Sequence, residues 1–192
     1  MAKEDTNYGL EANSEIKEIA APVFDYQPLK PESFRPKIGL IGCGGITTNH
    51  LNAYRQDKLE VAAFCDLNAD SAEKRRKEFY PEATCYTDYR QLLDRGDIEV
   101  VDIALHPGPR AAVIEAALHA GKHVLSQKPF ALDLDVAEKL VALADEKGLK
   151  LAVNQNGRWA PYVRYIQLAI DAGLIGEIHV VNIFLNWDHT WI

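Results

Sequence analysis

The glycine-rich stretch "IGCGGITT" (residues 41–48) is the part of the sequence whose residue types and spacing most directly suggest chemistry. Gly42 is suited to a tight turn, and Gly44 lacks a Cβ that would keep a phosphate away from the backbone. Gly45 adds room at the same turn. The helix expected to begin near Ile46 would point its N-terminal N–H groups and the positive end of its dipole at an anion. The pattern predicts a cradle for the pyrophosphate of a dinucleotide.

Two further positions bear on this prediction. Thr47 stands where the G-x-G-x-x-G pattern has its third glycine, a position that governs close packing of helix on strand and tolerates a small residue. Asp66 follows the next apolar run, 24 residues after Gly42, where a carboxylate accepts hydrogen bonds from ribose hydroxyls. It would also repel a 2′-phosphate, which favours NAD over NADP. Two other interpretations stay open: a tight turn without a ligand, and Asp66 as the cap of the following helix.

Short apolar runs alternate with stretches of helical period from Lys37 onward. This alternation is typical of βαβ units and predicts an α/β fold, a Rossmann doubly wound parallel sheet. Gly121 and Gly148 end two helical stretches, where glycine suits the left-handed position after a helix. Asp133 or Asp135 is suited to cap the second of these helices. The expected strands are 37–41, 59–66, 84–87, 100–105, 123–127 and 150–155, and the two helices are 109–121 and 132–148.

Three regions are expected along the chain. Residues 1–36 lack a sustained period and gain prolines toward their end, which indicates a loosely attached N-terminal arm. Residues 37–156 form the dinucleotide-binding domain. Residues 157–192 supply a connecting helix that reaches about Gly176 and a strand over 177–187, the first elements of a second α/β domain with an open sheet. A lone strand cannot bury a face, so we expect the chain to stop just inside that domain.

Composition narrows the classes of partner. The 28 acidic and 21 basic residues give a net charge of −7, and the scattered Lys and Arg residues argue against nucleic acid. No apolar run is long enough to span a membrane and no signal-peptide core is present, so a cytoplasmic location is expected. The three cysteines have no CxxC spacing, which argues against a metal site and a disulfide framework: Cys43, Cys65 and Cys85.

Four segments, "IGLIGCGGI", "VAAFCD", "AALHAGKHVLSQKPFALD" and "NQNGRW", together resemble the Gfo/Idh/MocA oxidoreductases, from Lys37 to about Trp191. The most telling part is "AGKHVLSQKP", which is similar to the family's A-G-K-H-V followed by E-K-P. In that family an N-terminal Rossmann domain holds NAD or NADP, and a second domain supplies most of the substrate site and the oligomer interface. The resemblance implies a dehydrogenase of sugars, polyols, inositols or related hydroxy compounds, assembled as a homo-oligomer through the second-domain sheet.

Lys128 occupies the position of the E-K-P lysine. The resemblance implies that it lies beside the nicotinamide and hydrogen-bonds the substrate oxygen at which hydride transfer occurs. A cation there polarises a carbonyl as negative charge develops, or helps to withdraw a hydroxyl proton in reverse. Taken alone, the residue reads as an exposed lysine. Gln127 and Asn154 are implied to contact the cofactor by the same resemblance.

The sequence departs from the family pattern in several places. Gln127 replaces the family's Glu and puts a neutral amide beside Lys128. The family's Thr-Pro after the fourth strand becomes Leu-His-Pro, and its customary His on the next helix is Arg110. His106 is a candidate cofactor contact because loops at strand carboxyl ends face the ligand crevice, but it also suits a plain turn.

The family's second domain carries an Asp and His pair in a D-x-x-x-H pattern that relays protons with the lysine. No such pattern can be placed before Ile192. We therefore expect this chain to bind its cofactor with little turnover of its own. The alternative to a dehydrogenase is a non-catalytic dinucleotide-binding module or an inactive fragment.

Overall fold

The computed structural model describes residues 20–184 and 186, which form two compact units. One unit consists of residues 28–160, and the other joins the described residues before 28 to those after 160. The larger unit contains a parallel sheet, and the smaller contains the helix α6 (Pro161–Asp171). None of the helices in these residues has the length and apolar character that a bilayer crossing requires.

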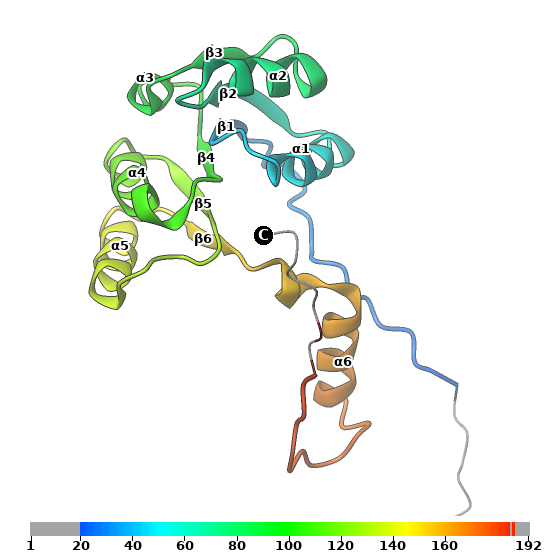
Figure 1. Cartoon of the computed structure of the whole chain (residues 1–192). Coiled ribbons are helices and arrows are strands. Elements are labelled where there is room, and N and C mark those ends of the chain that lie inside the picture. Colours follow the sequence, from blue (N-terminus) through cyan, green and yellow to red (C-terminus); the bar gives the residue numbers. More distant parts are fainter. Residues whose placement is uncertain (1–19, 185, 187–192) are drawn as a thin grey trace, which may run out of the picture. The chain divides into compact units, whose positions relative to one another are not determined.

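A six-stranded parallel sheet forms the centre of the larger unit (Figure 1). Its strands are β1 (Lys37–Ile41), β2 (Glu60–Cys65), β3 (Thr84–Tyr86), β4 (Val100–Ile103), β5 (His123–Gln127) and β6 (Leu151–Asn154). Their order in space is β3-β2-β1-β4-β5-β6, with every neighbouring pair parallel. The chain starts at β1, winds outward to β3, returns to β4 beside β1, and then winds to the other edge. The predicted doubly wound α/β fold is confirmed.

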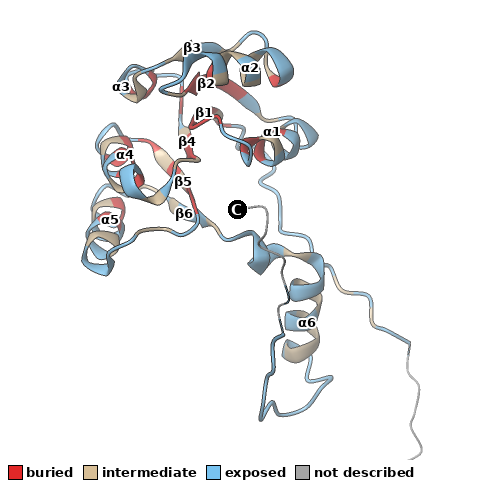
Figure 2. Ribbon diagram, in the orientation of Figure 1, coloured by how far each residue is buried: buried red, intermediate tan, exposed pale blue. Residues whose placement is uncertain are grey.

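Helices cover both faces of this sheet. They are α1 (Thr47–Gln56), α2 (Ala69–Phe79), α3 (Tyr89–Leu93), α4 (Pro107–His119) and α5 (Leu134–Glu146), followed by a 3₁₀ helix, η1 (Asn156–Trp159). Leu51 of α1 and Ala72 of α2 pack in one buried cluster, with Phe64 of β2. Val113 of α4 and Leu140 of α5 pack in a second cluster on the other face. The buried residues accordingly gather in the strands and on the helix faces turned toward them (Figure 2).

Most elements lie within a few residues of the predicted ranges. The helix α4 begins earlier than expected, at Pro107, because proline suits the first helical turn. Gly121 (φ 73°) and Gly148 (φ 64°) have the left-handed backbone predicted for them. Of the two candidate caps for α5, Asp133 is the one used: its carboxylate accepts a hydrogen bond from the backbone N–H of Val136 at 3.1 Å.

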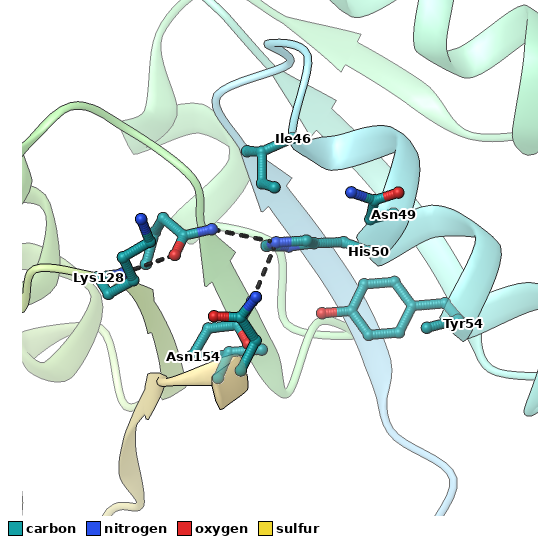
Figure 3. Close-up of a pocket in the computed structure, with 10 residues that line it drawn as sticks. Ile46, Asn49, His50, Tyr54, Lys128 and Asn154 are labelled. Carbon is teal, nitrogen blue, oxygen red and sulfur yellow. Dashed lines mark hydrogen bonds between the residues drawn. The ribbon is translucent and has the colours of Figure 1, made fainter. Parts of the chain in front are cut away.

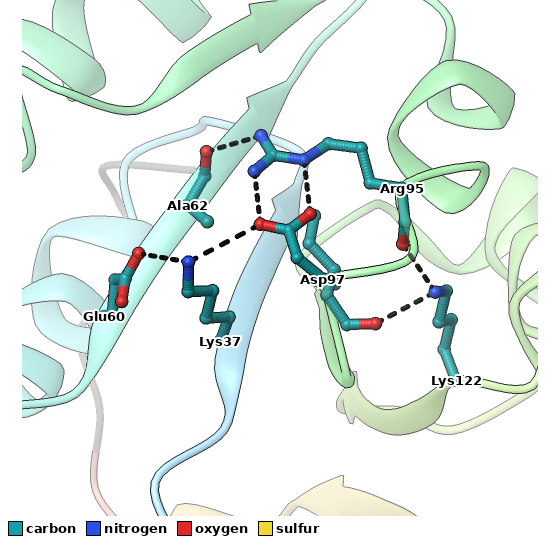
Figure 4. A network of polar contacts seen from close by, with 7 residues as sticks. Lys37, Glu60, Ala62, Arg95, Asp97 and Lys122 are labelled. Carbon is teal, nitrogen blue, oxygen red and sulfur yellow. Dashed lines mark hydrogen bonds and ion pairs between the residues drawn. The ribbon is translucent and has the colours of Figure 1, made fainter.

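A network of charged side chains closes the amino edge of the sheet (Figure 4). Arg95 donates two hydrogen bonds to Asp97, at 2.9 and 2.7 Å, and a third to the carbonyl oxygen of Ala62 at 2.9 Å. Lys37, the first residue of β1, lies 3.3 Å from Glu60 and 3.7 Å from Asp97. The hydrogen bonds from Arg95 lower the pKa of Asp97 to about 2. The network joins the amino ends of β1 and β2 to the loop before β4.

Lys122, in the "AGKHV" stretch, belongs to the same edge and is buried. Its ammonium group donates hydrogen bonds to the carbonyl oxygens of Arg95 at 2.7 Å and of Ile98 at 2.9 Å. A buried ammonium group needs such acceptors, and its two hydrogen bonds hold the loop before β4 in place. This part of the motif therefore serves the fold.

The smaller unit is built around α6. The hydroxyl of Tyr165 donates a hydrogen bond to the carbonyl oxygen of Pro22 at 2.9 Å, and its ring centroid lies 5.3 Å from that of Phe24. The helix ends short of the predicted Gly176, because the left-handed backbone of Gly173 (φ 70°) cannot continue a right-handed helix.

The strand predicted over 177–187 is wrong for the residues that the structure describes. Residues 177–184 and 186 have no strand, and the remainder of the range lies outside the described residues. Alternating apolar residues favour a strand, but a strand also needs a neighbour to take its backbone hydrogen bonds. No described strand pairs with this segment. In the predicted arm, residues 20–36 contain no helix or strand, and residues 1–19 lie outside the described residues.

Candidate active site

The carboxyl ends of β1 and β4 flank the point at which the strand order reverses. Ligands of open α/β sheets bind in the crevice at such a point. The predicted cofactor and catalytic residues all lie at this edge, either at the last residue of a strand or in the loop or turn that follows it. The topology therefore gathers at one edge residues that are far apart in the chain.

Gly42 makes the turn after β1 and has a left-handed backbone, with φ of 89°. Its N–H donates to the carbonyl oxygen of Cys65 at 2.8 Å, which ties the turn to β2. A Cβ at this position would lie 2.8 Å from the carbonyl oxygen of Ala104. Both the dihedral angle and the lack of space therefore require glycine.

Gly44 and Gly45 are different, because a Cβ added at either would meet no atom within 4 Å. The space over them is open, as an approaching phosphate requires. Thr47 begins α1 just behind them and is fully buried. Its hydroxyl donates to the carbonyl oxygen of Gly44 at 2.6 Å, so this side chain bonds to the turn instead of projecting from it. Ile46, one residue earlier, is the N-cap residue of α1, and its side chain makes no capping hydrogen bond.

Arg75 of α2 braces the glycine turn from the side. Its guanidinium donates to the carbonyl oxygen of Gly44 at 3.1 Å and to that of Cys43 at 3.4 Å. These bonds occupy the carbonyl side of the turn and bring a positive charge to it. Burial, followed by the nearby Asp66 carboxylate, raises the pKa of the Cys43 thiol to about 12. The contact between Arg75 and the glycine turn was not predicted from the sequence.

Asp66 follows β2 and fastens the glycine turn to the next loop. Its carboxylate accepts hydrogen bonds from the backbone N–H of Cys43 at 2.8 Å and of Asn68 at 2.9 Å. The cap of α2 is Asn68, whose side chain accepts from the N–H of Asp70 at 3.0 Å. The interpretation of Asp66 as the helix cap is therefore wrong.

A pocket of about 140 Å³ adjoins Asp66. Most of its walls are apolar, and they come from the ends of β1 and β2 and from the segments after β2, β3 and β4: Ile41, Cys65, Leu67, Thr87, Tyr89, Leu105, Pro109 and Val113. An apolar slot beside a carboxylate suits a flat heterocycle attached to a sugar. His106 is exposed at the N-cap position of α4 and does not line this pocket.

A second pocket, of about 290 Å³, lies at the start of α1 and the ends of β5 and β6 (Figure 3). It brings together four residues that the sequence proposed for the site, Ile46, Gln127, Lys128 and Asn154. The remaining lining residues were not predicted: Asn49, His50, Ala53, Tyr54, Leu125 and Asn156. The two pockets thus lie toward β2 and toward β5 from the glycine turn.

A buried polar network underlies the second pocket. Asp102 of β4 is fully buried, and its Oδ2 accepts hydrogen bonds from the Tyr54 hydroxyl at 2.8 Å and from Nδ1 of His50 at 2.7 Å. The other ring nitrogen of His50 lies 3.0 Å from the amide nitrogen of Asn154 and 3.3 Å from that of Gln127. Burial, and then the Asp102 carboxylate, raises the pKa of Tyr54 well above its usual value.

Asp102 is the one residue of this network that the sequence could have pointed to. An aspartate inside the apolar run "VVDIAL" cannot be buried without partners, so its presence requires donors on the neighbouring element. Which donors these are depends on the packing of α1 against β4. His50 is 52 residues from Asp102 in sequence, and no local pattern links them.

Arg110 links two loops of the crevice and is 1% exposed. Its guanidinium donates to the carbonyl oxygen of Leu105, after β4, and to that of Pro129, after β5. Burial lowers its pKa. The residue that replaces the customary histidine is therefore a structural link. Within the described residues, no group of three or more His, Cys, Asp or Glu side chains is placed to hold a metal ion.

Comparison with known proteins assigns the family. The family described as "Oxidoreductase family, NAD-binding Rossmann fold" (GFO_IDH_MocA) matches residues 36–155. D-apiose dehydrogenase of Paraburkholderia graminis is 36% identical over 143 residues, which cover 74% of this chain and 38% of that protein. Inositol 2-dehydrogenase of Salmonella typhimurium is 34% identical over 151 residues, 76% of this chain and 44% of that protein.

Solved structures agree with this assignment. A 3-ketoreductase from Actinomadura kijaniata in complex with NADP and TDP-benzene has a TM-score of 0.68 and 34% identity, covering 75% of this chain and 44% of that one. Scyllo-inositol dehydrogenase from Lactobacillus casei, with NAD(H) and scyllo-inositol, has a TM-score of 0.69 and 26% identity, covering 75% and 43%. This chain therefore spans less than half the length of these relatives. It belongs to the Gfo/Idh/MocA family of oxidoreductases with an NAD-binding Rossmann fold.

Proposed function

We propose that this chain is the cofactor-binding part of an NAD-dependent dehydrogenase that acts on a sugar, a polyol or a related hydroxy compound. The observation that carries the proposal is the open glycine turn between two pockets. A dinucleotide has two ring systems joined by a pyrophosphate, and this arrangement offers a place for each part. The proposed substrate class rests on the similarity to D-apiose dehydrogenase and inositol 2-dehydrogenase.

The pocket beside Asp66 is proposed to take the adenosine end. Two of its features suit adenosine: apolar walls for the base, and a carboxylate for the ribose hydroxyls. A 2′-phosphate would meet the negative charge of Asp66, so NAD is proposed over NADP. Arg75 is the cation beside the glycine turn, and its guanidinium donates to two backbone carbonyl oxygens. Among the described residues, no salt bridge joins Arg75 to Asp66.

The pocket lined by Lys128 is proposed to take the nicotinamide end. NAD, when bound, supplies the acceptor for a hydride from the substrate carbon. Lys128 is exposed at this pocket and places a cation where it stabilises the developing charge on the substrate oxygen. Gln127 and Asn154 line the same pocket from adjacent strands, and both are proposed to border the nicotinamide. His106, by contrast, is proposed only as a residue of the crevice rim.

Titration of the chain with NADH and NADPH, followed by cofactor fluorescence, tests the cofactor proposal. We expect NADH to bind more tightly than NADPH. Asp66→Asn removes the negative charge, so the NADH preference falls or reverses. Asp70→Asn is the matched control, since Asp70 lies in the first turn of α2 and lines neither proposed cofactor pocket. Failure of wild type to bind either cofactor, or an unchanged preference in Asp66→Asn, would contradict the proposal.

Turnover tests the role of Lys128. With NAD and a panel of sugars and inositols, in a protein that carries this sequence together with a substrate domain, Lys128→Met is expected to lower kcat by about 100-fold or more. The affinity for NADH should change by less than about threefold, because the proposed partner of Lys128 is the substrate. Binding of NADH without turnover of any tested compound would favour a non-catalytic dinucleotide-binding module.

A further inference from the structure

His50 occupies a central position beneath the proposed nicotinamide pocket. It lies on α1, is 7% exposed, and has polar partners on three strands: Asp102 on β4, Gln127 on β5 and Asn154 on β6. Figure 3 shows its ring between the side chains of Tyr54 and Asn154. Lys128 follows Gln127 directly, so any side chain that holds Gln127 also acts on the backbone of Lys128.

The partners of His50 determine where its proton lies. The Oδ2 atom of Asp102 already accepts the hydroxyl of Tyr54, and a carboxylate oxygen has no proton to offer, so Nδ1 of His50 must be the donor at 2.7 Å. Across the ring, Gln127 has a fixed orientation, because its Oε1 accepts the backbone N–H of Lys128 at 2.7 Å. A backbone N–H cannot reverse its role, so the NH₂ group of Gln127 faces the ring.

Gln127 therefore presents a donor to the ring, and in the structure the amide nitrogen of Asn154 faces the same ring atom. The Nε2 atom of His50 receives the NH₂ of Asn154 at 3.0 Å and that of Gln127 at 3.3 Å. With both amides in this orientation, an Nε2 atom that carried a proton would have no acceptor there. The imidazole is thus neutral, with its proton on Nδ1. Among the described residues, the titratable groups that face the ring are Asp102 and Tyr54, and Lys128 lines the same pocket.

We propose that His50 is a positioning residue that holds Gln127, and through it the backbone of Lys128, and that the amide of Gln127 keeps the imidazole neutral. The positioning role rests on the proposed function. A glutamate at position 127 would accept the N–H of Lys128 with one oxygen and present the other to Nε2 of His50. That oxygen needs a donor, so the ring would take up a second proton. The carboxylate and the imidazolium would then appear together, and their charges would offset each other beside Lys128.

Nuclear magnetic resonance of the ring nitrogens in the 192-residue chain tests the protonation state directly. Near neutral pH, wild type should show Nδ1 of His50 protonated and Nε2 unprotonated, with the signal assigned by its loss in His50→Gln. Gln127→Glu should show both nitrogens protonated. The matched control is Gln155→Glu, the same change at an exposed residue that does not line the pocket. A protonated Nε2 in wild type, or an unprotonated one in Gln127→Glu, overturns the proposal whether or not NADH binds.

Two readouts test the positioning role. Exchange of the Lys128 amide hydrogen should quicken about 10-fold or more in His50→Leu, because Gln127 loses the partner that orients its acceptor. With a substrate that the protein turns over, His50→Leu should lower kcat about 10- to 100-fold and leave NADH affinity within about threefold. His50→Gln, which can still accept a hydrogen bond, should recover part of both. Unchanged exchange and unchanged kcat in a folded His50→Leu protein would overturn the positioning role.

Discussion

Alanine at Gly42 and at Gly44 should separate stability from cofactor binding. Alanine at Gly42 must adopt φ near 89°, which costs an L-residue about 1–2 kcal/mol. Its Cβ would also lie 2.8 Å from the carbonyl oxygen of Ala104, so the end of β4 must shift. Together these effects should lower the free energy of unfolding by about 2–4 kcal/mol.

Gly44→Ala is expected to keep the stability of the protein and to weaken its binding of NADH. No atom lies within 4 Å of the added Cβ, and the backbone of Gly44 is not left-handed. The loss of unfolded-state entropy should leave the free energy of unfolding unchanged or raise it by about 0.4–1 kcal/mol. The methyl group would occupy the space proposed for the pyrophosphate. We therefore expect NADH to bind at least about 10-fold more weakly, a loss of about 1.4 kcal/mol.

Urea unfolding followed by circular dichroism measures the first quantity, and NADH fluorescence measures the second. Gly96→Ala is the matched control, because Gly96 also has open space around its Cβ position and lies before β4, at the amino edge of the sheet. It should affect the free energy of unfolding as Gly44→Ala does and leave the NADH affinity unchanged. Wild-type NADH affinity in Gly44→Ala would refute the proposed path of the pyrophosphate. Equal stability of Gly42→Ala and Gly44→Ala would refute the argument from backbone conformation.

Three other predictions concern titration and packing. Because burial raises the pKa of Cys43 to about 12, its thiol stays protonated near pH 8 and should resist iodoacetamide in the folded protein, as measured by mass spectrometry; rapid alkylation before unfolding would contradict this. Arg95 lowers the pKa of Asp97 from 3.8 to about 2, so its stabilising effect is complete above about pH 4 and disappears as pH falls toward 2. When the pH is lowered from about 4 to about 2, the free energy of unfolding measured with urea should fall less in Asp97→Asn than in wild type. Equal decreases in the two proteins would argue against the effect. Arg110→Met leaves the carbonyl oxygens of Leu105 and Pro129 without their charged donor and should lower the free energy of unfolding by about 1–3 kcal/mol, whereas Arg110→Lys should recover part of the loss; full stability in Arg110→Met would show that these carbonyls find other donors.

Local sequence patterns were sufficient to predict the strands of the sheet, most helix ends and the glycine turn. The residues that decide these features are neighbours in sequence: a left-handed glycine after a helix, an aspartate before one, and an apolar run between turns. Asp133, Gly121 and Gly148 have the predicted roles for this reason. Lys128 has no local signal, and only the resemblance of its surroundings to a family made it a candidate.

The parts that sequence reasoning missed depend on contacts between distant segments. The bond between His50 and Asp102 spans 52 residues, and the brace from Arg75 to Gly44 spans 31. Their existence follows from the crossing of helices over strands, which a local pattern does not specify. The strand expected over 177–187 failed in the opposite way, because a suitable local pattern found no neighbouring strand among the described residues.

The charged network of Arg95, Asp97 and Lys37 occupies the end of the strands opposite to the crevice. Between the charged network and the crevice lies an apolar interior, so the two sets of polar residues share no contact. Substitutions in this charged network that raise the melting temperature should consequently leave the preference between NADH and NADPH unchanged. The thermal stability of the protein can therefore be changed by substitutions at the amino ends of the strands, independently of the residues proposed to bind the cofactor at the carboxyl ends.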